Sequence, residues 1–141
     1  MSKITTHTTE FERPDLLKAA LDLMGAHYQE QAPIPGAYSY QEVDFAIDGT
    51  SFGYFRGIGY AFNPKSSRLE RKMDDMDLVW SPSLKQDVPC PEVADFETRL
   101  HNHYNLALLT EQLAQGQVDY QHTVLEDGSI IVEVTDYAFG A

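Results

Sequence analysis

The chain has little of three things: cysteine, long apolar runs and, towards its end, positive charge. Cys90 is the only cysteine among 141 residues, so no internal disulfide can form, which agrees with a reducing compartment. No apolar run approaches the roughly 18 residues of a membrane-spanning helix, and the opening MSKITTHTTEFERPD lacks the apolar segment of a signal peptide. These absences predict a soluble, cytoplasmic protein with no membrane partner.

Positive charge is missing after Arg99. Residues 1–70 carry six Lys and Arg against nine Asp and Glu, and residues 71–141 carry four against thirteen, so the halves contribute −3 and −9 to the net charge of −12. Because Lys and Arg provide most of the binding to nucleic acids and anionic membranes, this balance argues against both partners. It favours a basic protein partner, or it serves solubility alone.

The first half of the chain predicts a strand, a helix and a pair of strands. Residues 3–11 are rich in β-branched side chains, which favour a strand. The segment RPDLLKAALDLMG has leucines and alanines at helical spacing, so it predicts a helix over 14–24. Residues 31–38 are expected to form a rigid loop. Apolar and polar residues then alternate over 43–47, and residues 49–64 are expected to return as the next strand.

The second half predicts a further helix and a hairpin. Residues 69–80 allow either a strand or a short helix, and a proline-rich connector follows at about 81–94. Asp95 is expected to be the N-cap of a helix that ends before Gly116. The last segment, VDYQHTVLEDGSIIVEVTDY, predicts two strands around a type I′ turn at Asp127-Gly128.

This order of elements predicts a single α+β domain over residues 1–141. Antiparallel strands joined by short turns, with helices gathered on one face, form a two-layer sandwich. The expected arrangement is an antiparallel sheet with two helices on one face, on the ferredoxin-like plan.

Both ends of the chain carry stretches that point to a family. The opening MSKITTHTTEF…LLKAALDLMG and the later RLHNHYNLALLTEQLAQG…VLEDGSIIVEV resemble the Ycf thirty-five-like proteins, a domain of unknown function (number twelve fifty-seven). The segment GIGYAFN lies where that family has an Asp-Ile-Gly-Phe-like strand. Tyr104 matches a Tyr that the family commonly carries, whereas Ala107 stands where it usually has a His. The resemblance implies a small protein of a bacterium, a phage-infected cell or a plastid stroma, without an agreed activity and in some cases encoded near AAA-type ATPases.

The stretch RGIGYAF, residues 56–62, matches half of the signature by which RNA-recognition domains stack bases. Arg56, Gly57, Gly59 and Tyr60 fit the pattern, but Ile58 stands where the first stacking ring belongs. RNA stacking needs exposed rings beside a basic groove, and the acidic balance opposes such a groove. Core aromatics, with glycines that mark a bulge or a close backbone approach, are the favoured interpretation.

An alternative function keeps this glycine-aromatic strand, residues 52–62, as a working surface. On this interpretation the chain is a ligand-binding, RNA-binding or enzymatic domain. Its candidate ligand-binding residues are Tyr54, Arg56, Tyr60 and Tyr104. A deep polar pocket at these residues would favour the alternative, and a closed sheet face would argue against it.

Metal and nucleophilic sites find little support in the spacing of their residue types. His101 and His103 point about 200° apart on a helix, so they cannot chelate one ion together. Cys90 has no neighbouring base or positive charge that would form a thiolate. The aspartates at 74, 75 and 77 lack the pattern of a calcium loop and are expected to form a solvated acidic face. We predict no metal, no cofactor and no catalytic residue.

The second predicted helix carries one apolar stripe more than a surface helix needs. Phe96, Leu100 and Tyr104 begin a stripe that can face the core. A second stripe lies about half a turn away and consists of Leu106, Leu109 and Leu113. It is expected to be covered by the connector or to bind a partner. These leucines therefore predict a non-catalytic protein that binds another protein or a second copy of itself.

Overall fold

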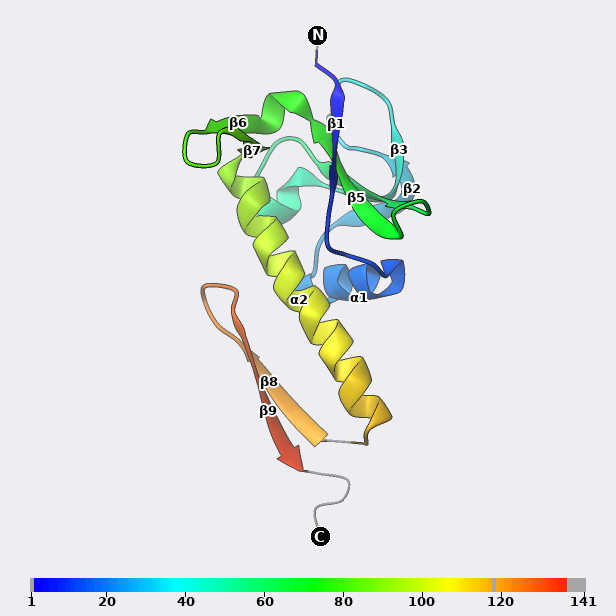
Figure 1. Cartoon of the computed structure of the whole chain (residues 1–141), viewed down its shortest axis with the longest axis vertical. Helices are drawn as coiled ribbons and strands as arrows, with labels where there is room; N and C mark the ends of the chain where they lie inside the picture. Colours follow the sequence, from blue (N-terminus) through cyan, green and yellow to red (C-terminus); the bar gives the residue numbers. More distant parts are fainter. Residues whose placement is uncertain (1, 118, 137–141) are drawn as a thin grey trace.

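The computed structural model describes residues 2–117 and 119–136, which form an α+β structure built on a five-stranded antiparallel sheet. The strands lie in the order β1-β5-β4-β3-β2, so that β1 and β2 are the two edges of the sheet (Figure 1). Their bounds are β1 Ile4–Thr8, β2 Tyr28–Pro33, β3 Glu42–Ile47, β4 Ile58–Asn63 and β5 Arg68–Asp74.

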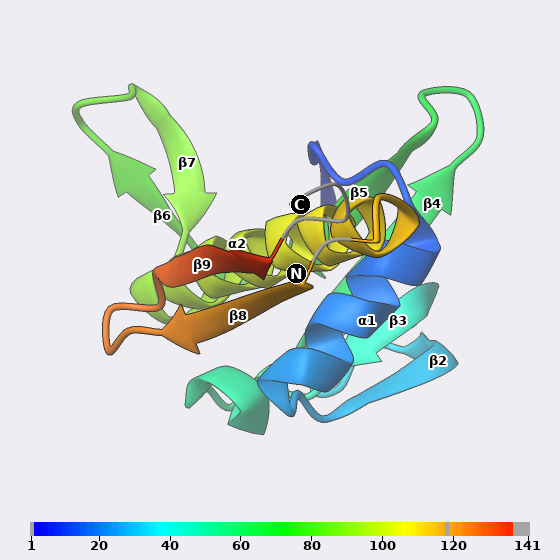
Figure 2. The same cartoon turned by 90° about the horizontal axis from the view of Figure 1, so that it is seen from below.

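The other elements are two α-helices, two short 3₁₀ helices and two separate hairpins. The helices are α1 Pro14–Met24, α2 Pro91–Gln115, η1 Gly49–Phe52 and η2 Asp75–Asp77. The hairpins are formed by β6 Leu78–Ser81 with β7 Gln86–Pro89, and by β8 Asp119–Val124 with β9 Ile130–Asp136. Figure 2 shows α1 and α2 crossing each other in front of the sheet.

Both helices share one hydrophobic core with the sheet, which is the packing expected of a two-layer α+β sandwich. The ferredoxin-like plan is not confirmed, because four strands of the sheet and the β6–β7 hairpin lie between α1 and α2, where that plan has two strands. The core side chains of the helices are Leu16, Leu17, Ala20, Leu21, Val93, Phe96, Leu100, Tyr104 and Ala107. Those of the sheet are Phe45, Ile47, Ile58, Tyr60, Leu69 and Met73.

α1 lies where the sequence predicts it. Pro14 occupies the first turn, where a backbone N–H is not needed and the fixed φ of proline suits a helix. Gly25 follows its last residue as the C-cap. The Arg13 guanidinium, just before the helix, contacts Glu111 of α2 at 2.7 Å and so joins the two helices.

α2 begins earlier than predicted. Pro91 lies in its first turn, whereas Asp95 is already inside the helix and pairs with Arg99 one turn later, at 3.0 Å. The prediction was wrong because a proline at the first helical position can start a helix without a polar cap. The connector expected at about 81–94 is correspondingly short, since β7 and the first turn of α2 occupy much of that range.

β2 is the strand that the sequence pattern does not reveal. Ala32 is the one residue of β2 that is buried, so no apolar alternation marks this edge strand, and the loop expected over 31–38 is wrong for residues 31–33. The ambiguous segment 69–80 contains both kinds of structure, because β5 is followed by η2 and then by β6.

The C-terminal hairpin forms as predicted but around a different turn. The Leu125 N–H donates to the Ser129 carbonyl at 2.8 Å, so residues 126–128 form the loop. Gly128 has a φ of 89°, but Asp127 has no positive φ, and a type I′ turn requires both. A type I turn followed by a left-handed glycine fits this geometry. The outermost residues of the predicted hairpin, Val118 and Tyr137, lie outside the described residues.

Candidate functional site

Two of the four candidate ligand-binding residues, Tyr60 and Tyr104, are core residues. Tyr60 is fully buried, and its hydroxyl donates to Glu97 Oε2 of α2 at 2.6 Å. Burial, and then the charge of Glu97 and the hydrogen bond to it, raise the pKa of Tyr60 well above its usual value. The buried Tyr104 hydroxyl accepts from the backbone N–H groups of Glu12 and Arg13, at 3.2 and 3.0 Å. Tyr60 therefore cannot stack a nucleic-acid base while the core is intact.

The other two candidates, Tyr54 and Arg56, meet at a buried carboxylate that the sequence analysis placed in solvent. Arg56 Nε donates to Asp77 Oδ2 and the Tyr54 hydroxyl donates to Asp77 Oδ1, both at 2.7 Å. Only 5% of the Arg56 side chain and 2% of the Asp77 side chain are exposed. The hydrogen bond to Asp77 raises the pKa of Arg56, and burial followed by that carboxylate raises the pKa of Tyr54.

Asp74 is a second buried carboxylate beside this ion pair. It accepts hydrogen bonds from the Ser2 hydroxyl at 3.1 Å, the Met76 N–H at 3.0 Å and the Tyr38 N–H at 3.4 Å. Burial opposes ionisation, but the hydrogen bonds from the Met76 and Tyr38 amides and the Ser2 hydroxyl, together with the charge of Arg56, outweigh it and lower the pKa of Asp74. The prediction of a solvated acidic face is therefore wrong for Asp74 and Asp77. Their carboxylates are buried and accept hydrogen bonds from other segments of the chain instead of facing water.

Two exposed aromatic rings lie against the buried Arg56 guanidinium. Its Cζ atom is 5.1 Å from the centroid of the Tyr38 ring and 4.8 Å from that of the Phe55 ring. The exposed fractions of Tyr38 and Phe55 are 69% and 76%. Met76 is 58% exposed, and its backbone N–H donates to the same Asp74 carboxylate as the N–H of Tyr38. We call Tyr38, Phe55 and Met76 the Arg56 patch. The patch is exposed, but its backbone is fixed by the Arg56, Asp74 and Asp77 hydrogen bonds.

The second leucine stripe of α2 is covered in part by the chain's own β8–β9 hairpin, and not by the connector, one of the two covers expected for it. Figure 1 shows this hairpin beside the second half of α2. Leu106 is only 4% exposed, and Leu109 and Leu113 are half-buried. Leu106 and Leu109 line a cavity of about 240 Å³ together with Asn102, Asn105, Ile130 and Val132. Binding of a partner by these leucines stays a prediction, and it would compete with the hairpin.

Among the described residues, two side chains of α2 form hydrogen bonds with the hairpin, and both bonds are at its turn. Asn102 Nδ2 donates to the Gly128 carbonyl at 2.9 Å, and Arg99 Nη2 donates to the Glu126 carbonyl at 3.3 Å. A two-stranded hairpin is at best marginally stable alone. The apolar contact with the leucine stripe is therefore expected to keep β8 and β9 folded.

Replacing Leu109 by Glu is expected to release the hairpin and leave the five-stranded sheet intact. The new carboxylate would face Ile130 and Val132, in a part of the chain that has no Lys or Arg to pair with it. Hydrogen exchange measured by mass spectrometry should show loss of protection over 119–136 alone. Gln112→Glu adds the same charge to an exposed position of α2 and is the control. Retained protection in Leu109→Glu would contradict this view of the hairpin.

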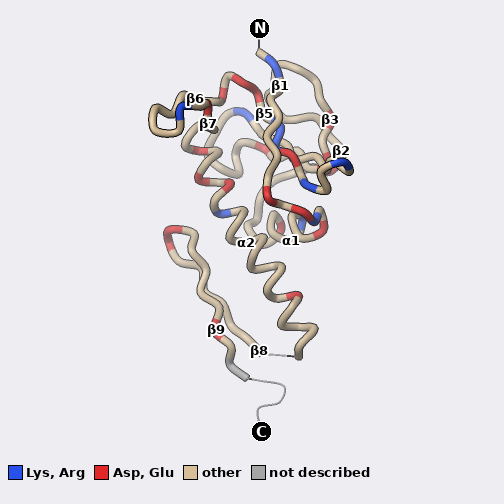
Figure 3. The backbone as a smooth tube through the Cα atoms, viewed as in Figure 1, with Lys and Arg blue, Asp and Glu red and all other residues tan. Residues whose placement is uncertain are grey.

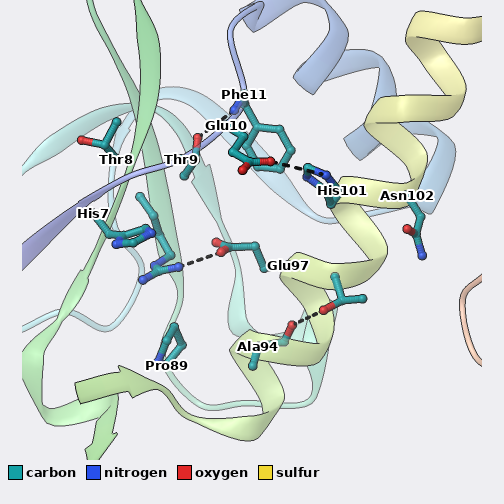
Figure 4. A pocket seen from close by; sticks show the side chains of 12 residues that line it. His7, Thr8, Thr9, Glu10, Phe11, Pro89, Ala94, Glu97, His101 and Asn102 are labelled. Atoms are coloured by element: carbon teal, nitrogen blue, oxygen red, sulfur yellow. Dashed lines mark hydrogen bonds and ion pairs between the residues drawn. The ribbon is translucent and has the colours of Figure 1, made fainter. Parts of the chain in front are cut away.

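A hollow with several polar side chains lies between β1 and α2 and is shown in Figure 4. This β1–α2 cavity measures about 510 Å³, and residues 7–11, Arg71, Pro89 and one face of α2 line it. Glu97 extends from α2 towards β1, and His101 lies beside Phe11, with ring centroids 5.5 Å apart (Figure 4). The cavity combines an apolar wall with several polar side chains, the usual composition of a small-molecule site.

Histidine and cysteine do not assemble a reactive centre in the described residues. His101 Nε2 lies 4.0 Å from Glu10 Oε2, whereas His103 Nδ1 contacts the Arg99 carbonyl at 2.8 Å, so the two imidazoles serve different neighbours. Cys90 is buried, and that burial raises the pKa of its thiol. Over residues 2–117 and 119–136, no three His, Cys, Asp or Glu side chains are grouped closely enough to hold a metal ion.

No protein-family model, curated protein or solved structure matches the chain. Neither α1 nor α2 has the length and apolar composition required to cross a bilayer.

Proposed function

We propose that the chain is a non-catalytic module that binds another protein, and that the Arg56 patch is its contact surface. The observation that carries this proposal is the pair of exposed rings, Tyr38 and Phe55, held against a buried guanidinium. Aromatic and methionine side chains are enriched in the centres of protein interfaces, and rigid ones lose little conformational entropy on binding. The patch has this composition and this rigidity.

The burial of Tyr60 and Arg56 supports a binding role over the alternative enzymatic or RNA-binding role. Tyr60 and Arg56 are buried, and their polar atoms are engaged by Glu97 and Asp77. An exposed apolar group on a fixed backbone favours a contact with a folded partner rather than chemistry.

Charge supports a basic partner. The net charge is −12, and Figure 3 shows the second half of α2 and the β8–β9 hairpin without Lys or Arg. A negative electrostatic potential accelerates association with a positively charged protein and repels nucleic acid. The resemblance to the Ycf thirty-five-like family supports the same role, and a AAA-type ATPase or a phage-host factor is a partner of the proposed kind.

The double substitution Tyr38→Ser and Phe55→Ser is expected to abolish capture of the partner and to leave the fold intact. Each removes an exposed ring, so stability should change little, whereas the loss of an interface hot spot weakens binding by about thirtyfold. Affinity capture from the source cells, followed by titration of the purified captured protein, measures the binding, and thermal denaturation measures the stability.

Leu23→Ser provides the matched control, because Leu23 is 55% exposed and lies on α1, outside the patch. Sedimentation of the purified chain tests self-association, for which the double variant should shift the oligomer to monomer. Equal binding by the native chain, the control and the double variant would reject the proposal.

A further inference from the structure

Arg71 lines the β1–α2 cavity with a guanidinium that is only partly used. Its side chain is 7% exposed, and Nη1 donates to Glu97 Oε1 at 2.7 Å. Nε is buried and has no hydrogen-bond partner, which native proteins rarely tolerate. Nη1 is thus the one nitrogen of this guanidinium that has an acceptor in the described part of the chain.

The neighbouring carboxylate does not accept from the remaining donors in this structure. Glu97 Oε1 accepts from Arg71, and Glu97 Oε2 accepts from the Tyr60 hydroxyl at 2.6 Å. Both oxygens are therefore engaged, and Tyr60 is held in place by the core. The unpartnered edge of the Arg71 guanidinium, formed by Nε and Nη2, is the edge that binds a carboxylate through two parallel hydrogen bonds, the second of which requires the buried Nε to be uncovered.

The cavity wall suits the remainder of an organic acid. Phe11, Pro89 and Ala94 give it an apolar side, and the cavity volume of about 510 Å³ lies in the usual range of ligand sites. His7 also lines the cavity; it is exposed, and its ring has no hydrogen-bond partner among the described residues.

The charges around the cavity favour a singly charged ligand. Glu97 and Glu10 both line it, and the chain as a whole is strongly acidic. These charges would repel a doubly charged phosphate more strongly than a monocarboxylate. A monocarboxylate also has oxygens that accept hydrogen bonds, but it carries half the charge.

We propose that the β1–α2 cavity binds a small organic monocarboxylate, whose carboxylate accepts hydrogen bonds from Arg71 and whose apolar part lies against Phe11, Pro89 and Ala94. None of the residues of the Arg56 patch lines this cavity, so this site is independent of the proposed protein-binding surface.

Titration of the native chain with butyrate, followed by ¹H–¹⁵N NMR, tests the proposal. The Arg71 Nε–H resonance should shift in a saturable manner. Arg71→Lys retains the charge but loses the two-pronged geometry, and it should weaken binding by about tenfold. Arg68→Lys, on the same strand at a more exposed position, is the matched control and should leave the affinity unchanged.

Ala94→Leu gives a second test that does not disturb the Arg71–Glu97–Tyr60 hydrogen bonds. Ala94 is an exposed cavity-lining residue of α2, so a larger side chain there should occupy the apolar side of the cavity, preserve the fold and hinder butyrate. Inorganic phosphate should not displace butyrate. Absence of saturable shifts, undiminished binding by Ala94→Leu, or saturation by phosphate and not by butyrate would each overturn the assignment.

Discussion

Asp77→Asn is expected to lower the free energy of unfolding by about 3–5 kcal/mol, because it leaves the buried Arg56 guanidinium without its counter-charge. Asp77 also accepts from the Tyr54 hydroxyl, so the substitution weakens two hydrogen bonds at once. Both partners of the ion pair are almost completely buried, and water cannot replace the lost charge. Urea denaturation of the native chain and the variant measures the difference.

The double variant Arg56→Met and Asp77→Leu separates the charge effect from a packing effect. Removal of both charges eliminates the unpaired ion, so much of the stability should return. Asp15→Asn, which breaks the exposed pair between Arg13 and Asp15, should have little effect because solvent screens that interaction. A double variant as unstable as Asp77→Asn would show that the loss comes from shape and not from the unpaired charge.

Gly57→Ala is expected to destabilise the protein by roughly 3 kcal/mol through a backbone clash. A Cβ atom at this position would collide with the Ile47 carbonyl oxygen, and it would lie 2.9 Å from the Pro35 ring. The carbonyl belongs to the last residue of β3, so it cannot move without disturbing the pairing of β3 with β4. Thermal and urea denaturation should both detect the loss.

Gly53→Ala is the comparison for Gly57→Ala, because it introduces the same methyl group into open space. Gly53 has a φ of 70° and nothing within 4 Å of its added Cβ, so about 1 kcal/mol of backbone strain is the whole expected cost. If the two variants were equally stable, the close approach of the Ile47 carbonyl would not be the reason that residue 57 is glycine.

Gly57 also shows how well local sequence patterns predicted this fold. The sequence pattern indicates either a bulge or a close backbone approach for the glycines of this stretch, and at Gly57 the collision of an added Cβ with the Ile47 carbonyl oxygen confirms the close approach. The stripe of α1, the alternation of β3 and the buried stripe of α2 were equally clear, because each is a local periodicity. β2 was missed for the opposite reason, since an exposed edge strand has little apolar pattern.

The polar interior could not be predicted from spacing along the chain. Arg56 and Asp77 lie 21 residues apart, and Arg71 and Glu97 lie 26 apart, so only the fold brings each pair together. The sequence pattern therefore indicated a solvated face for Asp77, and it gave Arg71 no role. The hairpin that covers Leu106 was predicted as an element, but its position against α2 depends on tertiary packing alone.

At the β2 edge, copies of the chain are poorly suited to joining their sheets into a larger one. Gln31 has a φ of 52° and takes no part in the ladder with β3, although Glu30 and Ala32 on either side of it do. Pro33 has no N–H to donate to an incoming strand, and Glu30 adds a charge. An interrupted ladder, a proline and a charged residue are the features by which natural edge strands resist aggregation. Any protein that meets this edge is therefore recognised by side chains and not by backbone strand addition.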